Sequence, residues 1–381
     1  MQAFESDLEL LRHYRRDLHQ IPEVGFELPE TLSYVHRVLE SLLATSFGKT
    51  GKLRIWSPAK SCLCAFFDVG AQHTLAVRAD MDGLPVSEDS GVSFASKHAG
   101  KMHACGHDGH MAMALGLARW LALHPEEASV NVLVIFEPAE ETTGGARTVI
   151  ESGALKECTA EGIMGFHLWP DLAEGQIASR PSALLAGSNE VNIDVKGRSS
   201  HIAKASQGAD ALEAAARILL SCYASVKEFN NQEACLLKFG YMQAGRVRNQ
   251  IASSARLEGS LRSFSQTMQE RLKSTLGRVA KEEAEKLGCS TQLSFSEGYP
   301  PVMNDPSLYA NIKGLLPELT DLEEPLLISD DFAWYQREIP GVFLLLGTGT
   351  GIPLHSDKFC FDESILARGL LVYQRIIRQI H

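Results

Sequence analysis

The chain has 381 residues, of which 45% are hydrophobic and 22% charged, a composition typical of a soluble globular enzyme. Its length suits two domains of unequal size. The formal net charge is −11, from 36 basic and 47 acidic residues, and the sequence has no long basic run, so we do not expect a nucleic-acid partner.

The sequence predicts neither a secretory leader nor a membrane span. Acidic residues interrupt the N-terminal segment from Glu5 onward, so it has no apolar core of the kind that a signal peptide needs. The longest apolar runs, such as 342–346, are too short to cross a bilayer. The eight cysteines are scattered and suit free thiols in a reducing cytosol. We therefore expect a cytoplasmic protein without a membrane partner.

The first half of the chain alternates strands with helices. Near-continuous apolar runs at 75–79 and 130–136 are typical of strands that are buried on both faces of a mostly parallel sheet. Between them, residues 107–123 carry apolar side chains at helical spacing. The order strand, helix, strand predicts an α/β layer.

The middle of the chain has a different pattern. Strands near 191–196 and 256–262 alternate apolar and polar residues, which is typical of antiparallel sheets with one solvent-exposed face. Amphipathic stretches at about 208–228 and 266–287 separate these strands. Together they predict a small α+β domain at 184–292, inserted into the larger one.

The end of the chain again combines a buried strand and a helix, as in the first half: the strand is predicted at 342–346 and a final helix at 364–380. The predicted fold class is therefore α/β. It comprises a discontinuous domain of residues 1–183 and 293–381, with a mostly parallel sheet flanked by helices, and the inserted α+β domain.

The richest cluster of reactive side chains is KMHACGHDGHM, residues 101–111, which places a thiol, three imidazoles and a carboxylate in a glycine-containing turn before a helix. Cys105 and His107 are spaced so that both can reach one metal ion, and a helix N-terminus favours a thiolate. Three interpretations stay open here: a metal site, a nucleophilic cysteine beside a histidine, and a polar turn with packed histidines.

Three glutamates, Glu137, Glu140 and Glu141, follow the buried strand that ends at Phe136. Catalytic groups of α/β sheets gather at the carboxyl ends of strands. Of the adjacent pair Glu140 and Glu141, one carboxylate can bind a cation while its neighbour stays available as a base. The alternative is a solvated acidic loop.

Further polar residues follow other apolar strands. Asp80 and Asp82 come just after the strand at 75–79 and suit either a turn or a carboxylate that orients a metal-binding histidine. His167 ends the apolar run of GIMGFHLWP, and His355 lies in the loop GIPLHSDKF. A single histidine in such a place is more often structural than a ligand.

Considered together, four strand ends each deliver a side chain that can bind a metal. The mixture of sulfur, nitrogen and oxygen donors suits zinc, manganese, cobalt or nickel. Five protein ligands are too many for one open catalytic site and suit two divalent ions that share a water, whose pKa falls to about 7. The predicted ligands are Cys105, His107, one of the two glutamates Glu140 and Glu141, His167 and His355.

These segments resemble the amidohydrolase branch of the M20 metallopeptidase family, which includes hippurate hydrolases, auxin-conjugate hydrolases and N-acetyldiaminopimelate deacetylases. The matching motifs run in family order over nearly the whole chain, and the combination of CGHD, PAEE and the late LH is highly specific. They are RRDLHQIPEVGFE (15–27), RADMDGLP (78–85), MHACGHDGHM (102–111), FEPAEE (136–141), FHLWPDLAEGQI (166–177), KGRSSHIA (196–203), NQIASSARLEGSLR (249–262), SDDFAWY (329–335) and LHSDKF (354–359).

The resemblance implies a catalytic domain built from both ends of the chain and an inserted lid domain that commonly mediates dimerisation. It implies that Cys105, His107, Glu141, His167 and His355 are the metal ligands, that Glu140 is the general base and that Asp80 has a catalytic role. His201 matches a lid histidine that helps to bind the substrate carbonyl, commonly across a homodimer. Asn249 and Arg262 match lid positions near the substrate carboxylate.

The chain departs from the family pattern at Gly83, where alanine is common and the change is neutral, and in two places that bear on the site. The lid segment reads HIAKASQGADA, with Ile202 and Ala205 where the family has an alanine and a proline, which affects the shape of the loop more than His201 itself. The glutamate that the family places before Asp-Phe is here the shorter Asp330, which we expect to reshape the pocket.

We therefore expect metal-dependent hydrolysis of the amide bond of a small N-acyl amino acid. Glu140 would move a proton from water to the departing amine, and His201 would stabilise the oxyanion. Two rivals stay open: an amidase that uses Cys105 as its nucleophile, and a non-catalytic protein that binds metal or a metabolite. The stretch FASKHAGKMHACGHD is closest to the N-acetyldiaminopimelate deacetylases, while hippurate-like substrates stay open.

Overall fold

The structure is a computed structural model that describes residues 2–142 and 144–380, and it divides into two compact units. Both ends of the chain build the first unit, which consists of Met1–Ser182, Met303–Glu323 and Asp331–His381. The second unit consists of Ala183–Val302 and Glu324–Asp330. It thus continues beyond residue 292, the predicted end of the inserted domain. It also includes the short segment Glu324–Asp330, called the return segment.

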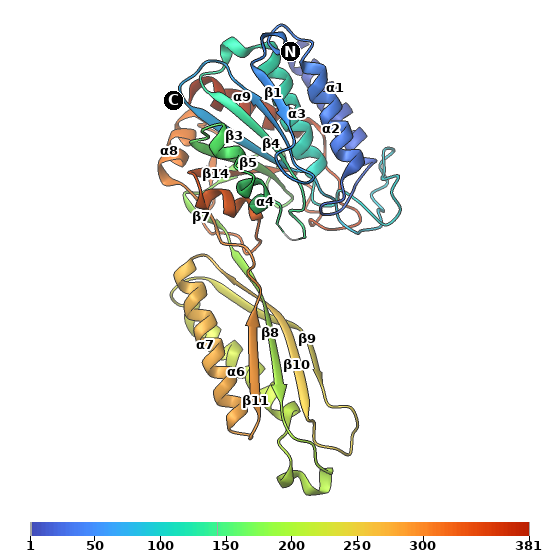
Figure 1. The fold of residues 1–381 in the computed structure, drawn as a ribbon, viewed down its shortest axis with the longest axis vertical. Helices are drawn as coiled ribbons and strands as arrows, with labels where there is room; N and C mark the ends of the chain where they lie inside the picture. The colour runs from blue at the N-terminus through green and yellow to red at the C-terminus, as the bar shows by residue number, and fades with distance from the viewer. Residues whose placement is uncertain (1, 143, 381) are drawn as a thin grey trace. The chain divides into compact units, whose positions relative to one another are not determined.

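A mostly parallel sheet of eight strands forms the centre of the first unit (Figure 1). Its strands are β1 (Leu53–Trp56), β2 (Leu63–Phe67), β3 (Thr74–Asp80), β4 (Asn131–Glu137), β5 (Gly162–Trp169), β6 (Ile177–Ser179), β13 (Thr320–Asp321) and β14 (Gly341–Gly347). They lie in the order β1-β2-β4-β3-β5-β14-β6-β13. The neighbours β4, β3, β5 and β14 are parallel, while β1 with β2, β2 with β4, and β14 with β6 are antiparallel pairs. Every residue of β3, β4 and β14 is buried, which explains their continuous apolar runs.

The helices of the first unit are α1 (Gln2–His19), α2 (Pro29–Leu42), α3 (His107–Leu123), α4 (Ala146–Glu151), α5 (Ala154–Glu157), α8 (Pro306–Leu315) and α9 (Ser364–Gln379), with the 3-10 turns η1 (Gly48–Thr50), η2 (Pro125–Glu127) and η4 (Asp331–Arg337). Helix α3 packs against β3 and also against α1 and α9, so it is buried along almost its whole length. Gly116 permits the close approach of α1, because a Cβ there would lie 2.7 Å from Leu11. This packing fixes the N-terminus of α3 beside the sheet.

The second unit has its own sheet and core. Its elements are β8 (Gly187–Lys196), η3 (Ile202–Gln207), α6 (Ala211–Phe229), β9 (Cys235–Ala244), β10 (Ser254–Ser263), α7 (Gln266–Glu285) and β11 (Ser290–Phe295). The strands form an antiparallel sheet in the order β11-β8-β10-β9, and α6 and α7 pack against it. Val191, Ile193 and Leu257 belong to its separate hydrophobic core. The chain passes between the two units near β7 (Ser182–Leu185) and β12 (Val302–Asn304).

The predicted fold class is confirmed: a mostly parallel sheet flanked by helices and a separate antiparallel α+β unit. The alternating burial of β8 agrees with the pattern predicted for a sheet with one solvent-exposed face. All eight cysteines are free, as expected. Among the residues that the structure describes, no helix combines the length and apolar character that crossing a membrane would require.

Candidate metal centre

The carboxyl ends of the parallel strands bring the reactive side chains of the first unit together. Asp80 ends β3, Glu137 ends the neighbouring β4, and His167 lies near the end of β5 on the other side of β3. Cys105 and His107 stand at the N-terminus of α3, which follows β3 along the chain. Because parallel neighbours end at one edge of a sheet, segments that are far apart in the sequence meet there.

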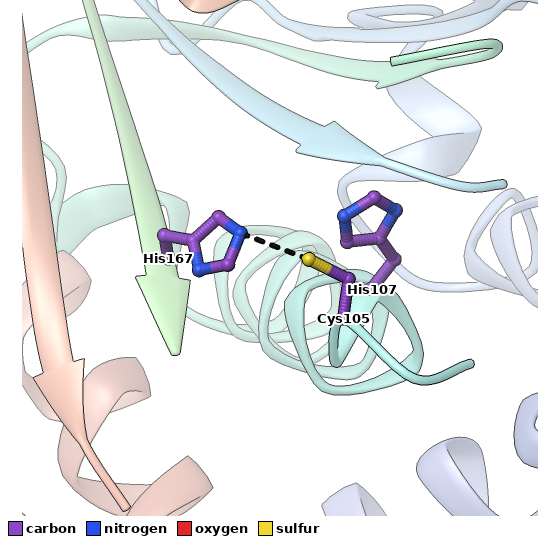
Figure 2. A group of neighbouring side chains, drawn as sticks. All are labelled: Cys105, His107 and His167. Atoms are coloured by element: carbon purple, nitrogen blue, oxygen red, sulfur yellow. Dashed lines mark hydrogen bonds between the residues drawn. The ribbon is translucent and has the colours of Figure 1, made fainter. Parts of the chain in front are cut away.

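Cys105, His107 and His167 form a compact group of buried donors (Figure 2). One donor atom of each lies within 4.8 Å of the others, and Cys105 Sγ is 3.4 Å from His167 Nε2. Burial raises the pKa of the Cys105 thiol, and the charges of Glu141 and Glu140 raise it further. Such a thiol is a weak nucleophile, whereas a bound cation would favour its thiolate form.

Backbone carbonyls orient both histidines of this group. His107 Nδ1 lies 2.8 Å from the carbonyl oxygen of Asp82, and His167 Nδ1 lies 2.7 Å from that of Leu168. A carbonyl only accepts hydrogen bonds, so each Nδ1 carries the proton and donates it. The Nε2 lone pair of a neutral imidazole is then directed to the cluster, as in metal-binding histidines whose other nitrogen is hydrogen-bonded.

The surroundings of His107 suit a cation. Its Nε2 atom is buried, has no hydrogen-bond partner among the described residues, and lies 3.7 Å from Asp80 Oδ2 and 3.9 Å from Glu141 Oε1. Burial alone would lower the pKa of His107, but Asp80, Asp82 and Glu141 outweigh burial and raise it to about 10. These separations are too long for hydrogen bonds and match donors placed around a shared positive charge.

Two further groups of donors share members with the first. Cys105, Glu141 and His355 have donor atoms within 4.8 Å of one another, and so have His107, Glu140 and Glu141. His355 Nε2 is 3.1 Å from Glu141 Oε1, and the imidazole is 49% exposed. All five predicted ligands thus lie in one set of overlapping groups, the arrangement that two neighbouring ions with common ligands require.

Asp82 holds the segment that carries the two glutamates. Its carboxylate accepts the backbone N–H groups of Glu140 at 3.0 Å and of Glu141 at 3.2 Å. Ala139, just before them, has a φ of +61°, a conformation that side-chain-bearing residues rarely adopt. The fold thus fixes the direction in which the two adjacent carboxylates point.

Asp80, for which the family resemblance implied a catalytic role, is fully buried, and both of its carboxylate oxygens accept hydrogen bonds. Arg78 donates to Asp80 Oδ2, and His110 Nδ1 donates to Oδ1 at 2.6 Å. Burial would raise the pKa of Asp80, but Arg78, His107 and His110 hold it well below its ordinary value. His110 Nε2 accepts the N–H of Leu168 at 3.0 Å, so both nitrogens of His110 are engaged although it lies near His107.

A charged network next to this site was not predicted from the sequence. The buried Arg78 guanidinium contacts three carboxylates, with Glu137 at 3.0 Å and Asp331 at 2.7 Å in addition to Asp80. Asp331 also accepts the N–H of Ala146 at 2.9 Å. An arginine inside an otherwise apolar strand was the available signal, because a buried charge needs partners.

The predicted lid residues lie in the second unit at two separate places. Ile202, next to His201, donates its N–H to the carbonyl of Asn249 at 3.0 Å, which brings His201 and Asn249 into one pair of loops. Arg262 lies near the far end of β10 and donates to Ser329 Oγ at 2.6 Å. The path along β10 from Ser254 to Arg262 is roughly 26 Å at about 3.3 Å per residue.

The two departures from the family pattern have different surroundings. Ile202 and Ala205 belong to the exposed turn η3, where Ile202 is 48% exposed. Asp330 is buried, in the return segment of the second unit. His201 caps η3, and its Nδ1 accepts the N–H of Ala203 at 3.2 Å.

The family model described as Peptidase family M20/M25/M40 matches residues 76–379. The chain belongs to this family. An N-acetyldiaminopimelate deacetylase of Streptococcus uberis is 35% identical over 363 residues, which cover 93% of this chain and 95% of that protein. A protein of the same name from Shouchella clausii is 34% identical, with 93% of this chain and 94% of that protein covered.

The fold of this M20 chain agrees with that of a solved member. The Bacillus subtilis YXEP protein, described as a dinuclear metal binding peptidase from the M20 family, matches with a TM-score of 0.83 and 29% identity over 98% of each chain. The protein is therefore a hydrolase, and the predicted class of metal-dependent amide hydrolysis is confirmed. The rival interpretation of a cysteine-nucleophile amidase finds no support in these relatives.

Proposed function

We propose that the first unit binds two divalent ions and hydrolyses the amide bond of a small N-acyl amino acid. The observation that carries the proposal is the overlap of three donor groups through Cys105, His107 and Glu141, with Glu140 directly beside them. We assign the metal-ligand roles to these three residues, His167 and His355. Zinc, manganese, cobalt and nickel all suit this donor set.

The proposed chemistry divides between the ions and the protein. When bound, the ions polarise the scissile carbonyl and lower the pKa of the attacking water to about 7. Glu140 accepts a proton from that water and donates it to the departing amine. Asp80 acts as a positioning residue, because its carboxylate is engaged by Arg78 and His110. His201 donates to the oxyanion of the tetrahedral intermediate.

For the substrate we propose an N-acetyl amino acid of the diaminopimelate class. The support is the identity of 35% and 34% to two N-acetyldiaminopimelate deacetylases over nearly the full length of all three chains. The amine product would then be the free diamino acid.

We further propose a homodimer. His201 and Asn249 lie together, whereas Arg262 is separated from them by most of β10, roughly 26 Å. One small substrate cannot contact both places on a single chain, so different protomers would supply them. In addition, β9 is an edge strand of the described sheet, and Tyr241 and Met242 on β9 and Leu220 on α6 are exposed. The free cysteines support a cytoplasmic location.

The test is the release of free amine from a panel of N-acyl amino acids, with chelator and after addition of manganese, zinc, cobalt or nickel. We expect cleavage that chelator abolishes and metal restores. Cleavage that persists in strong chelator and is lost to iodoacetamide would instead support a cysteine nucleophile.

The variant Glu140→Gln tests the assignment of Glu140 as the general base. We expect turnover to fall by about 100-fold or more while metal content stays at the wild-type level, because a general base acts on the proton and not on the ion. The matched control is the adjacent Glu141→Gln, which should lose metal. Near-normal turnover of Glu140→Gln would overturn the assignment.

A further inference from the structure

The second unit contains a cavity of about 430 Å³ at the loops that carry His201 and Asn249. Ile202, Leu212 and Val247 form apolar parts of its wall, and Arg246 and Arg248 provide two guanidinium groups. Gln250, which pairs with His201 in an isolated β-bridge, also lines the cavity. The cavity is therefore lined by the chain neighbours of both lid residues, Ile202 next to His201 and Arg248 and Gln250 on either side of Asn249.

The charge around this cavity is opposite in sign to that of the chain as a whole. The net charge of the chain is −11, yet the only acidic side chain in segments 196–210 and 244–255 is Asp210. The backbones of these two segments are joined by hydrogen bonds, as between Gly197 and Ser253. The basic residues of the two segments are Lys196, Arg198, Lys204, Arg246 and Arg248.

Arg246 and Arg248 are exposed, and among the described residues neither forms an ion pair. Other arginines of this unit are engaged: Arg217 with Glu213 at 2.7 Å, and Arg256 with Asp194 and Glu258. An arginine pair in a partly apolar cavity suits a carboxylate on a carbon chain, because the guanidinium binds carboxylates in a bidentate manner.

Asp210 is the acidic residue among the described residues that line the cavity, and its carboxylate already accepts hydrogen bonds. Asp210 Oδ1 caps α6 by accepting the N–H of Leu212 at 2.9 Å and of Glu213 at 3.3 Å. Its charge is thus held at a helix N-terminus, where the backbone N–H groups offset it. The guanidinium groups of Arg246 and Arg248 remain the side chains available to an anionic ligand.

We propose that this cavity binds a second carboxylate of the substrate, beyond the α-carboxylate next to the scissile amide, and that Arg246 and Arg248 select for it. The inference rests on the proposed function, because it takes His201 and Asn249 as substrate contacts. Arg248 directly precedes Asn249, so the Cα atoms of the two residues are about 3.8 Å apart. The additional carboxylate belongs either to the side chain of the amino acid or to a dicarboxylic acyl group.

Two matched pairs of compounds distinguish these sources. Nα-acetyldiaminopimelate and Nα-acetyllysine differ only in the distal carboxylate of the amino acid. N-succinyl-alanine and N-succinamoyl-alanine differ only in the charge of the acyl end. Binding is measured by calorimetry in the metal-loaded Glu140→Gln enzyme, which separates recognition from turnover, and kcat/KM is measured in the enzyme with Glu140 present.

We expect one charged member to bind at least tenfold more tightly than its neutral partner. In Arg246→Gln/Arg248→Gln the ratio should fall to near one, and added salt should reduce the ratio in the protein with both arginines. The matched control is Arg217→Gln, an exposed arginine of α6 outside the cavity, which should keep the ratio.

The outcomes separate the inference from the proposed function. Equal binding of charged and neutral members, in an enzyme whose turnover requires metal, would overturn the inference and leave the amide hydrolysis standing. A ratio that persists in the double variant would also overturn it. A metal-loaded enzyme that binds the charged member selectively but cleaves no panel compound would support the cavity and count against the hydrolysis.

Discussion

Gly106 separates the candidate ligands Cys105 and His107 and adopts a φ of +87°. A Cβ at this position would lie 2.8 Å from the Leu168 side chain, so the backbone conformation and the available space both require glycine. The two donors can therefore face one centre only while this turn is preserved. Their positions depend on a residue that has no reactive group.

Gly106→Ala should lower the free energy of unfolding by about 1–3 kcal/mol, because it forces a side chain into a left-handed turn that is also crowded. Metal content per chain should fall as well, since Cys105 and His107 shift. Denaturant titration and metal analysis measure the two effects. Gly51→Ala is the control: φ is +75° but nothing lies within 4 Å, so it should cost stability and leave metal content intact.

The variant Asp82→Asn tests whether the Asp82 carboxylate holds the segment that carries Glu140 and Glu141 in place. An asparagine retains one acceptor oxygen but turns an N–H donor toward one of the two backbone N–H groups of Glu140 and Glu141. We expect metal affinity to fall by about 10- to 100-fold, as for groups that orient ligands. A variant with unchanged metal affinity and unchanged kcat would show that Asp82 does not position this segment.

At the scale of elements, buried charges join α1, the loop 81–106 and α3. His19 Nδ1 lies 2.8 Å from Asp108 Oδ2 on α3, and His19 Nε2 lies 3.0 Å from Glu88 Oε1 in the loop. Arg15 also contacts Asp108, at 3.1 Å. Phe94 from the same loop packs edge-on against His19. The long loop is thereby held close to the helix that carries His107.

The buried contacts of His19 with Asp108 and Glu88 predict a loss of stability at alkaline pH. Burial and Arg15 oppose the charged form of His19, but Asp108 and Glu88 outweigh them and raise its pKa to about 9 from an ordinary value of 6.5. Because the folded pKa is the higher one, the contribution is complete below pH 6.5 and is lost as the pH rises through 9. The expected loss is about 3 kcal/mol.

Urea unfolding of the protein at pH 6 and pH 9.5 measures this loss. His19→Gln, which cannot titrate, should be less stable at pH 6 and should lack this part of the pH dependence. His13→Gln removes an exposed histidine of the same helix, paired with Asp17, and should retain it. Equal pH dependence in wild type and His19→Gln would contradict the argument.

At the scale of the whole molecule, each unit has a hydrophobic core of its own. The proposed metal ligands all lie in the first unit, whereas the proposed contacts to the rest of the substrate lie in the second. The edge strand β9 leaves backbone groups without partners in the described sheet, which favours pairing with another chain.

The homodimer is tested by light scattering on Met242→Lys, which places a charge on the exposed part of β9. We expect the wild type to have twice the chain mass of 41.7 kDa and the variant to have that of one chain. The monomer should keep its metal and lose most turnover, because His201 of one chain would contact the substrate bound to the other chain. A fully active monomer would show that His201 acts within its own chain.

Much of the fold was readable from periodicity. The buried runs at 75–79 and 342–346 became β3 and β14, and the amphipathic stretches became α6 and α7 with ends shifted by a few residues. The full extent of the second unit could not be predicted from the sequence, because its return segment Glu324–Asp330 has no apolar periodicity that marks it as part of this unit. Such a segment joins a unit through contacts that local sequence does not encode.

The fold class and the family could be predicted from the sequence alone, and so could the candidate donors, because apolar periodicity and closely spaced reactive residues are local properties. Tertiary structure decided how those donors are used. In the folded chain both nitrogens of His110 form hydrogen bonds. Arg78 contacts carboxylates that include Asp331, 253 residues away in the sequence. The tertiary structure also put Arg262 at the far end of β10 from His201 and gathered two arginines at one cavity. These outcomes depend on which strand ends and loops meet in space, and only the packed chain fixes that.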